Sequence, residues 1–389
     1  MSAPHWLVPL SDVVGDDELV DAASEAVRSG WWSTGPRVAE LEERFAEANT
    51  TPHAIAVANG TAALHLALLA AGVGPGDEVI TPSLTFVAVA NAIRHTGATP
   101  VFCDILGEHD LNLDPADLEA AITPRTKAVV VLHYGGFACD MAAVAELADR
   151  HGLTVIEDAA HAVGATWEGR ACGTLGALGC FSFFSNKNLP IGEGGMVVTA
   201  DDELAARVRL LRSHGMTTLT WDRHRGHASA YDVVAVGFNY RLDEIRAAMA
   251  LVQLGRLPAA TAERARLGNR YVALLHDVEG LTVPFAERPD RAQAAHHIAV
   301  VLLPESVHRE EVRAALTAAG VQTSVHYPPI HGFTAYADAA PRPLPRTEAV
   351  APRLLTLPLY PNLTDENLEL VGDRLLHAVR ETRLTATHA

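Results

Sequence analysis

Residues 180–195 read Cys-Phe-Ser-Phe-Phe-Ser-Asn-Lys-Asn-Leu-Pro-Ile-Gly-Glu-Gly-Gly, an apolar run that contains one lysine and ends in a glycine-rich turn. Lysine occurs at only two places in the 389-residue chain, Lys127 and Lys187, and the second lies in this run. An amine on an apolar strand loses hydration, which disfavours the ammonium form and lowers its pKa. A neutral amine can attack a carbonyl carbon, as a Schiff-base lysine does. Lys187 is therefore the candidate nucleophile, and an exposed loop lysine is the alternative.

The chain upstream of this run alternates between strand-like and helix-like segments. Strands are predicted at 78–81, 100–104, 128–132 and 153–156, and helices at 86–95, 115–121 and 142–151. Such alternation predicts an α/β fold with a largely parallel sheet, whose ligands bind at the carboxyl ends of the strands. The glycine-rich segment 72–76 precedes a strand instead of following one, which disfavours a nicotinamide Rossmann enzyme.

A candidate anion site lies at the start of the helix predicted from residue 59. A short strand, 53–58, precedes this helix directly. Gly60 lets a ligand approach the backbone closely, and Thr61 adds a hydroxyl to the free N–H groups of the first helical turn. An ordinary helix cap is the alternative reading of these residues.

Three further side chains follow strands at the same edge of the predicted sheet. Asp158 closes the apolar run 153–156, so its carboxylate should emerge at the rim, where a buried acid needs a partner. Phe86 follows strand 78–81 and could stack on a flat heterocycle or be an ordinary core phenylalanine. His161 lies three residues after Asp158 and could bind a ligand or be structural.

Three motifs together resemble one known family: 157–161 (Glu-Asp-Ala-Ala-His), 180–195, and 237–241 (Gly-Phe-Asn-Tyr-Arg). Over almost its whole length the chain resembles the DegT/DnrJ/EryC1/StrS sugar aminotransferases, which use pyridoxal 5′-phosphate (PLP). The resemblance implies a fold-type I PLP-dependent transferase, similar to aspartate aminotransferase. A large PLP-binding domain is expected at 1–252 and a small C-terminal α+β domain at 253–389.

The C-terminal domain is expected to begin with a long helix that ends near residue 275, directly after an Ala-rich helix at 242–254. Strands are predicted at 296–303 and 321–326, and helices at 309–319 and 364–380. These elements suit a small unit that folds back over the cofactor.

The resemblance also implies roles for residues around the cofactor. Lys187 would bond the cofactor and then move a proton between it and the donor carbon, while Asp158 would keep the pyridine nitrogen protonated. His161 would hydrogen-bond the phenolic oxygen of the ring, and Phe86 would stack on the ring. The residues expected at the phosphate are Gly60, Thr61, Ser182 and, from the neighbouring subunit of a homodimer, Asn239. A buried strand serine is the alternative for Ser182.

A second group of residues is expected to lie near the substrate. Its members are Trp32, Arg241, His326 and Tyr327. Packing in the core is the alternative for Trp32. Bracing of the fold is the alternative for Arg241.

The predicted reaction is transamination of a nucleotide-linked keto sugar, with L-glutamate as the amino donor. Some relatives carry His at the lysine position and act as dehydratases, so Lys187 favours transamination. Residues 192–195 (Gly-Glu-Gly-Gly) resemble members that aminate C-4 of a 4-keto-6-deoxyhexose, whereas many C-3 enzymes carry Gly-Asp-Ala-Gly there. C-4 of dTDP-4-keto-6-deoxyglucose is therefore the predicted target, in deoxysugar or antibiotic biosynthesis. The alternatives are a C-3 keto sugar or cyclitol aminotransferase, or a PLP-binding regulatory protein of the same fold.

Composition argues against several other classes of protein. The formal net charge of −17 disfavours nucleic acid and anionic membranes as partners, since both attract basic surfaces. The four cysteines form no CxxC pair, so no metal site is expected. The sequence has no secretory pattern at its start and no run of about 18 apolar residues. A reduced, cytoplasmic protein is expected.

Overall fold

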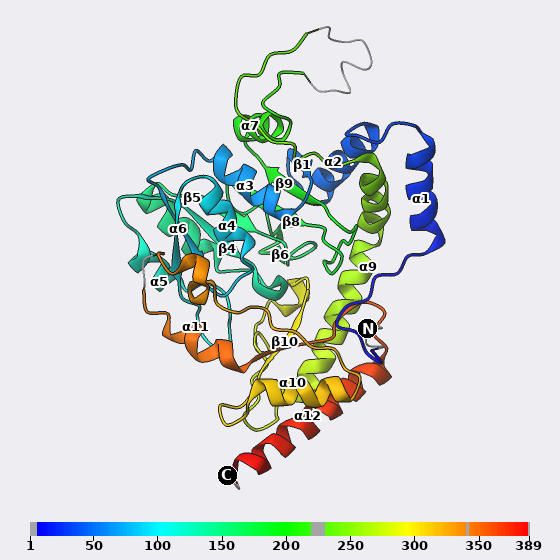
Figure 1. Cartoon of the computed structure of the whole chain (residues 1–389), viewed down its shortest axis with the longest axis vertical. Helices are drawn as coiled ribbons and strands as arrows, with labels where there is room; N and C mark the ends of the chain where they lie inside the picture. The colour runs from blue at the N-terminus through cyan, green and yellow to red at the C-terminus, as the bar shows by residue number, and fades with distance from the viewer. Residues whose placement is uncertain (1–5, 219–229, 340–341, 388–389) are drawn as a thin grey trace.

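The computed structural model describes residues 6–218, 230–339 and 342–387 (Figure 1). Its centre is a seven-stranded sheet in the order β1-β9-β8-β5-β4-β2-β3. The strands are β1 (His53–Val57), β2 (Glu78–Pro82), β3 (Thr99–Cys103), β4 (Thr126–Leu132), β5 (Thr154–Asp158), β8 (Leu178–Ser182) and β9 (Gly195–Thr199). The pairs β3/β2, β2/β4, β4/β5 and β5/β8 are parallel, and β9 is antiparallel to both β8 and β1. The predicted α/β fold with a mostly parallel sheet is confirmed.

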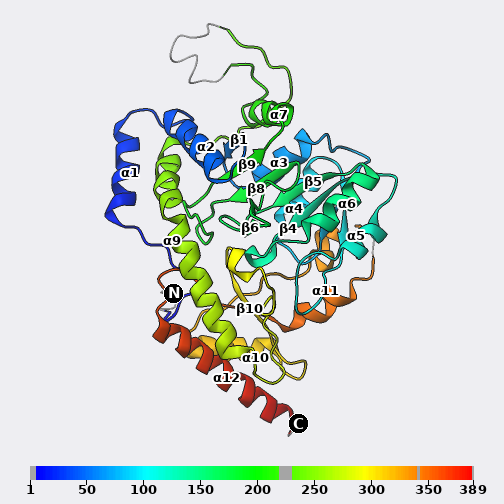
Figure 2. The same cartoon turned by 180° about the vertical axis from the view of Figure 1, so that it is seen from behind.

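Helices cover both faces of this sheet, as Figures 1 and 2 show from opposite sides. The helices α3 (Gly60–Ala70), α4 (Ala88–His95) and α7 (Asp202–Arg212) pack on one face. The other face packs against α2 (Pro36–Ala48), α5 (Pro115–Ala121), α6 (Met141–His151) and the first part of α9 (Glu244–Leu275). The helix α1 (Asp17–Arg28) lies against α9. A short hairpin, β6 (Thr166–Trp167) and β7 (Arg170–Ala171), follows β5 in the sequence.

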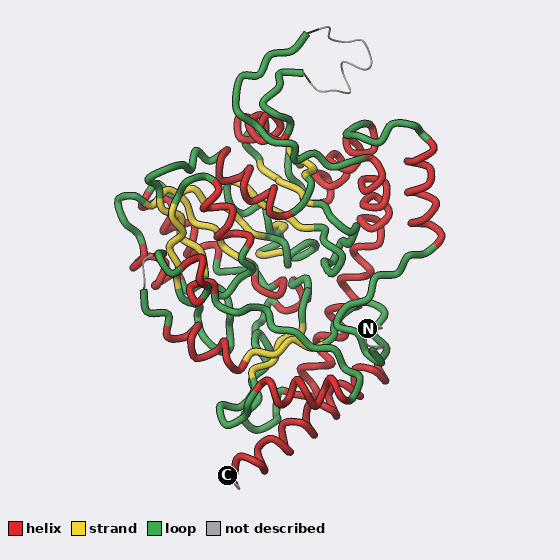
Figure 3. The backbone as a smooth tube through the Cα atoms, in the orientation of Figure 1, coloured by secondary structure: helices red, strands yellow, loops and turns green. Residues whose placement is uncertain are grey.

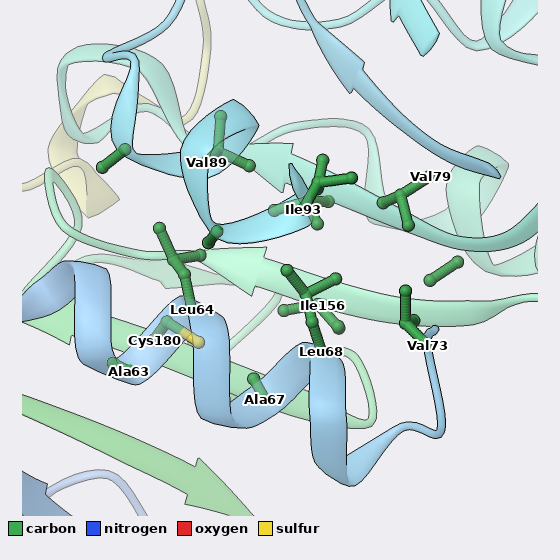
Figure 4. Close-up of a cluster of buried hydrophobic side chains, with 14 of the residues drawn as sticks. Ala63, Leu64, Ala67, Leu68, Val73, Val79, Val89, Ile93, Ile156 and Cys180 are labelled. Carbon is green, nitrogen blue, oxygen red and sulfur yellow. The ribbon is translucent and has the colours of Figure 1, made fainter. Parts of the chain in front are cut away.

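The sequence of α3 explains why this helix lies in the middle of a layer. It reads Gly-Thr-Ala-Ala-Leu-His-Leu-Ala-Leu-Leu-Ala, which is apolar on nearly every face, and a helix of that kind must be buried all round. Leu64 and Leu68 pack toward Ile156 of β5 and Ile93 of α4, in the cluster drawn in Figure 4. This packing fixes the N-terminus of α3 beside the carboxyl ends of β5 and β8.

A smaller unit of helices and two strands follows the sheet in the chain and lies below it in Figure 3. It has a hydrophobic core of its own. Its elements are β10 (Ala299–Leu302), β11 (Leu354–Leu357), α10 (Arg309–Ala318), α11 (Pro345–Val350) and α12 (Asp365–Thr387). The second half of α9 contributes Leu267, Tyr271 and Leu275 to that core. Short 3-10 turns complete the chain: η1 (Tyr134–Gly136), η2 (Arg291–Gln293), η3 (Ile330–Gly332), η4 (Thr334–Tyr336) and η5 (Ala351–Arg353).

The two helices predicted at 242–254 and from about 253 to 275 are one continuous helix, α9, with Pro258 inside it. The predicted domain boundary between residues 252 and 253 therefore falls within a helix. The division of the chain at that point stays a prediction.

The strand predicted at 321–326 is wrong. Val321 forms a parallel bridge with Val8, whereas Ser324 forms an antiparallel bridge with Thr356. Because the segment changes its partner within three residues, no continuous ladder forms. None of the described helices is both long and apolar enough to cross a membrane.

Candidate active site

A pocket of about 350 Å³ lies at the carboxyl ends of β5 and β8, the edge of the sheet at which the sequence predicts a ligand site. The register aligns Leu132 of β4 with Asp158 of β5, and Asp158 with Cys180 of β8, so these strand ends lie together. The predicted site residues that line the pocket are Gly60, Thr61, Phe86, Asp158, His161, Ser182, Lys187, His326 and Tyr327.

The N-terminus of α3 and the end of β8 form one wall of this pocket. The first N–H groups of a helix have no intrahelical partner. Asn59 caps α3 by accepting the N–H of Ala62 at 2.8 Å, while those of Gly60 and Thr61 have no hydrogen-bond partner among the described residues. A Cβ at Gly60 would lie 2.8 Å from Cβ of Ser182, so only glycine allows this approach. Two free N–H groups and two hydroxyls thus face one space, which suits a phosphate.

Lys187 lies in the turn after β8, where its backbone N–H donates to the carbonyl oxygen of Phe184 at 2.8 Å. Burial lowers the pKa of its amine to about 8, and the negative charge of Asp158 opposes that shift. Its Nζ lies 3.4 Å from Nε2 of His297. The amine therefore stands in the pocket with a pKa close to neutral pH.

Asp158 is the last residue of β5 and lines the pocket, whereas its neighbour Glu157 is buried away from the pocket. Glu157 is fully buried and accepts hydrogen bonds from His133 and from the backbone of the turn at 173–176. Asp158 faces the pocket and has no ion pair within 4 Å among the described residues. Burial raises the pKa of its carboxyl group, while the Ala160 N–H and the charge of Lys187 partly oppose the rise. A cationic partner would stabilise this carboxylate.

His161 is held in one tautomer. Its Nδ1 accepts the backbone N–H of Gly135 at 3.3 Å, so the proton of the neutral ring lies on Nε2 and is donated to the hydroxyl of Tyr327 at 2.7 Å. Burial keeps the pKa of His161 well below its usual range, so the ring is neutral. Tyr134 in turn donates to the carbonyl oxygen of His326. Tyr327 is thereby held in the lining of the pocket.

Residues 14–376 match the DegT/DnrJ/EryC1/StrS aminotransferase family. The chain belongs to this aminotransferase family. It is 42% identical over 385 residues to the spore coat polysaccharide biosynthesis protein SpsC of Bacillus subtilis, covering 97% of each chain. Members of the DegT/DnrJ/EryC1/StrS family are sugar aminotransferases that depend on PLP.

Solved structures of the same family agree with this fold. DesV of S. venezuelae, solved with a ketimine intermediate, is 39% identical with a TM-score of 0.85, over 93% of this chain and 94% of that one. DesI, solved in the presence of its TDP-sugar product, is 37% identical with a TM-score of 0.87, over 99% of this chain and 96% of that one. This chain is thus a PLP-dependent sugar aminotransferase with the α/β fold of the DegT/DnrJ/EryC1/StrS family.

The residues of the pocket fit PLP. The helix N-terminus with Ser182 suits the phosphate, and Lys187 offers an amine. The carboxylate of Asp158, which forms no ion pair with any described residue, suits the protonated pyridine nitrogen. Each of these features of the pocket matches one chemical group of the cofactor.

Three predicted residues do not line the pocket. Trp32 is 58% exposed, and its indole N–H donates to the carbonyl oxygen of Val27. Asn239 is exposed and pairs through its backbone with Ser213. Arg241 is partly buried beside β1, and its Nη1 has no hydrogen-bond partner in the part of the chain that the structure describes.

Sequence reasoning missed three polar residues at the site. Asn186 lines the pocket with a buried Oδ1 for which the described residues offer no hydrogen-bond partner, and Glu193 of the glycine-rich turn also lines it. His297 reaches Lys187 from a segment 110 residues away in sequence. The only local signal for His297 was its place at the start of the predicted strand 296–303.

Proposed function

We propose that this aminotransferase transfers the amino group of L-glutamate to C-4 of dTDP-4-keto-6-deoxyglucose. The observation that carries the proposal is that Lys187, Asp158 and the N-terminus of α3 with Ser182 line one pocket. The Gly-Glu-Gly-Gly turn supports the choice of carbon by resemblance, and the TDP-sugar product of DesI supports the choice of carrier.

Lys187 is proposed as the residue that bonds the cofactor and then carries the proton. When bound, PLP acts as an electron sink for the carbanion that forms after deprotonation. With a pKa of about 8, roughly a tenth of the Lys187 side chains are neutral at pH 7, against about one in 3,000 for a lysine at its ordinary pKa. The buried amine is therefore able to act as nucleophile and as base.

The other pocket residues are proposed to orient the cofactor. Asp158 would hold the ring-nitrogen proton through its carboxylate, and His161 would turn its Nε2–H from the Tyr327 hydroxyl to the phenolic oxygen. Phe86, which lines the pocket, would stack on the ring. Gly60, Thr61 and Ser182 bind the phosphate through backbone N–H groups and hydroxyls.

The functional unit is proposed to be a homodimer in the cytoplasm. Phe86 is 55% exposed in the single chain, Phe184 is 44% exposed, and Val236 is 90% exposed. Phe86 and Phe184 line the pocket, and apolar side chains so exposed suit a protein partner. Asn239 is exposed as well, so it is free to complete the phosphate site of the other subunit.

The proposed substrate contacts come from two sides. His326 and Tyr327 line the pocket directly. Trp32 and Arg241 lie outside it in the single chain and are proposed to reach the substrate of the partner subunit. The nucleotide is proposed to lie between the two chains, where such residues can contact it.

The test supplies PLP, L-glutamate and a panel of nucleotide-linked keto sugars to the purified protein. Mass spectrometry detects the amine product, and NMR locates the new amino group. Amination at C-4 of the TDP sugar is expected. Amination at C-3, or of a cyclitol ketone alone, would support the first alternative. Binding of PLP with no amine transfer from any donor would support a regulatory protein.

A further inference from the structure

His297 and Asn188 form a chain of contacts that ends at the amine of Lys187. Asn188 donates its amide Nδ2 to the carbonyl oxygen of Ala295 at 2.8 Å. A carbonyl can only accept, so the amide has one orientation, and its Oδ1 points to Nδ1 of His297 at 3.1 Å. Because an amide oxygen also only accepts, the proton of the neutral imidazole lies on Nδ1.

The tautomer of His297 has a consequence at its other nitrogen. With the proton on Nδ1, Nε2 carries a lone pair, and this lone pair faces Nζ of Lys187 at 3.4 Å. Burial and the nearby charge of Lys187 keep the pKa of His297 well below its usual range, so the ring stays neutral. His297 is thus an acceptor aimed at the amine.

We infer that His297, with its tautomer fixed by Asn188, is a positioning residue that holds the amine of Lys187 whenever this amine is not bonded to the cofactor. One N–H of the amine points to His297, so the nitrogen lone pair points away from it. The amine is thereby kept in one orientation between its two tasks as nucleophile and base. This inference rests on the proposed role of Lys187.

Other titratable groups also face Lys187. They are Asp158 at the end of β5, His161 in the loop that follows, and His326, which also lines the pocket. Asp158 raises the pKa of the amine, and the two histidines are kept neutral by burial. None of them forms a hydrogen bond to Nζ among the described residues, so only His297 supplies an acceptor at that atom.

The test measures the pKa of Lys187 in the apoenzyme, without turnover. The chain has two lysines, so trace labelling with acetic anhydride across pH, read by mass spectrometry, follows Lys187 with exposed Lys127 as internal standard. An acceptor favours the ammonium form, so His297→Phe should lower the pKa by about one unit, or 1.4 kcal/mol. His297→Gln keeps an acceptor and should stay near the wild-type value.

A matched control is the adjacent histidine. His296 is buried, and its Nε2 contacts the carbonyl oxygen of Arg291, away from Lys187. His296→Asn should lower the melting temperature without moving the pKa of Lys187. In the loaded enzyme, His297→Phe should lower kcat roughly tenfold with little change in KM for glutamate.

A second variant keeps the inference testable if His297→Phe does not fold. Asn188→Leu frees the tautomer of His297, which should again lower the pKa of Lys187. An unchanged pKa in a folded His297→Phe or Asn188→Leu protein would overturn the inference, as would an equal shift in His297→Gln. These outcomes are independent of the proposed function, which fails instead if Lys187→Ala retains turnover.

Discussion

A methyl group added at Gly60 should weaken PLP binding far more than it destabilises the fold. A Cβ at this position would lie 2.8 Å from Cβ of Ser182, whereas carbon atoms in contact are about 3.5–4.0 Å apart. The Cβ of Ser182 cannot move by rotation of its own side chain. The backbones of α3 and β8 must therefore separate by about 1 Å.

The stability change of Gly60→Ala should be modest. Overpacking typically costs about 1–3 kcal/mol, and replacing Gly by Ala in a helix returns up to about 1 kcal/mol. The phosphate site should suffer more, because its N–H groups and hydroxyls would separate. Loss of one charged hydrogen bond, worth about 1.5–3 kcal/mol, corresponds to a roughly ten- to hundredfold weaker affinity.

Titration of the apoenzyme with PLP, followed by absorbance or fluorescence, measures that affinity, and thermal unfolding of the same samples measures stability. Gly74→Ala is the matched control, since a Cβ there has no neighbour within 4 Å. If Gly60→Ala binds PLP as tightly as Gly74→Ala does, the cradle at α3 is not the phosphate site.

Four further outcomes are expected. Borohydride treatment of the PLP-bound protein should label Lys187, and a label on Lys127 would contradict the assignment of Lys187 as the residue that bonds the cofactor. The Lys187→Ala variant should fold but show no turnover. Asp158→Asn should lower kcat with PLP affinity largely retained, so normal turnover would remove this residue from the mechanism. Mixing Lys187→Ala chains with Asn239→Ala chains should restore activity above both parents, unless the phosphate site is complete within one subunit. Burial lowers the pKa of His65 from 6.5 to about 4, so the unfolded chain binds this proton at a higher pH than the folded chain does. The free energy of unfolding should therefore fall, by at most about 3 kcal/mol, as the pH drops from 6.5 toward 4. Urea unfolding of wild type and His65→Phe at pH 7 and pH 5 tests this, and an equal loss of stability in the two proteins would contradict it.

The sequence predicted the sheet well because its strands and helices are local patterns with clear ends. The predicted helix 115–121 coincides with α5, for example, where Asp114 caps a helix that begins at a proline. The strand predicted at 321–326 failed because its partners, Val8 and Thr356, come from distant segments that no local pattern reveals. His297 was missed for the same reason, since its relation to Lys187 exists only after the chain has folded.

The sequence predicted many of the residues that line the pocket, but it did not predict the hydrogen bonds between them. The resemblance placed His161 near the ring, but its tautomer depends on the backbone N–H of Gly135. The exposed positions of Asn239 and Trp32 likewise follow from the folded arrangement and not from residue type. Residue type can be read from sequence, whereas proton positions and burial follow from contacts between distant segments.

The continuous helix α9 has a consequence for any attempt to divide this protein. It runs for 32 residues, about 48 Å, and its two halves belong to different hydrophobic cores. A protein fragment that ends at residue 252 would carry only the first part of α9. The last carbonyl groups of that part would lose the N–H donors that follow them in the intact helix. The two hydrophobic cores therefore share one helix, and unfolding of either core should destabilise the other, so that both unfold in one cooperative transition.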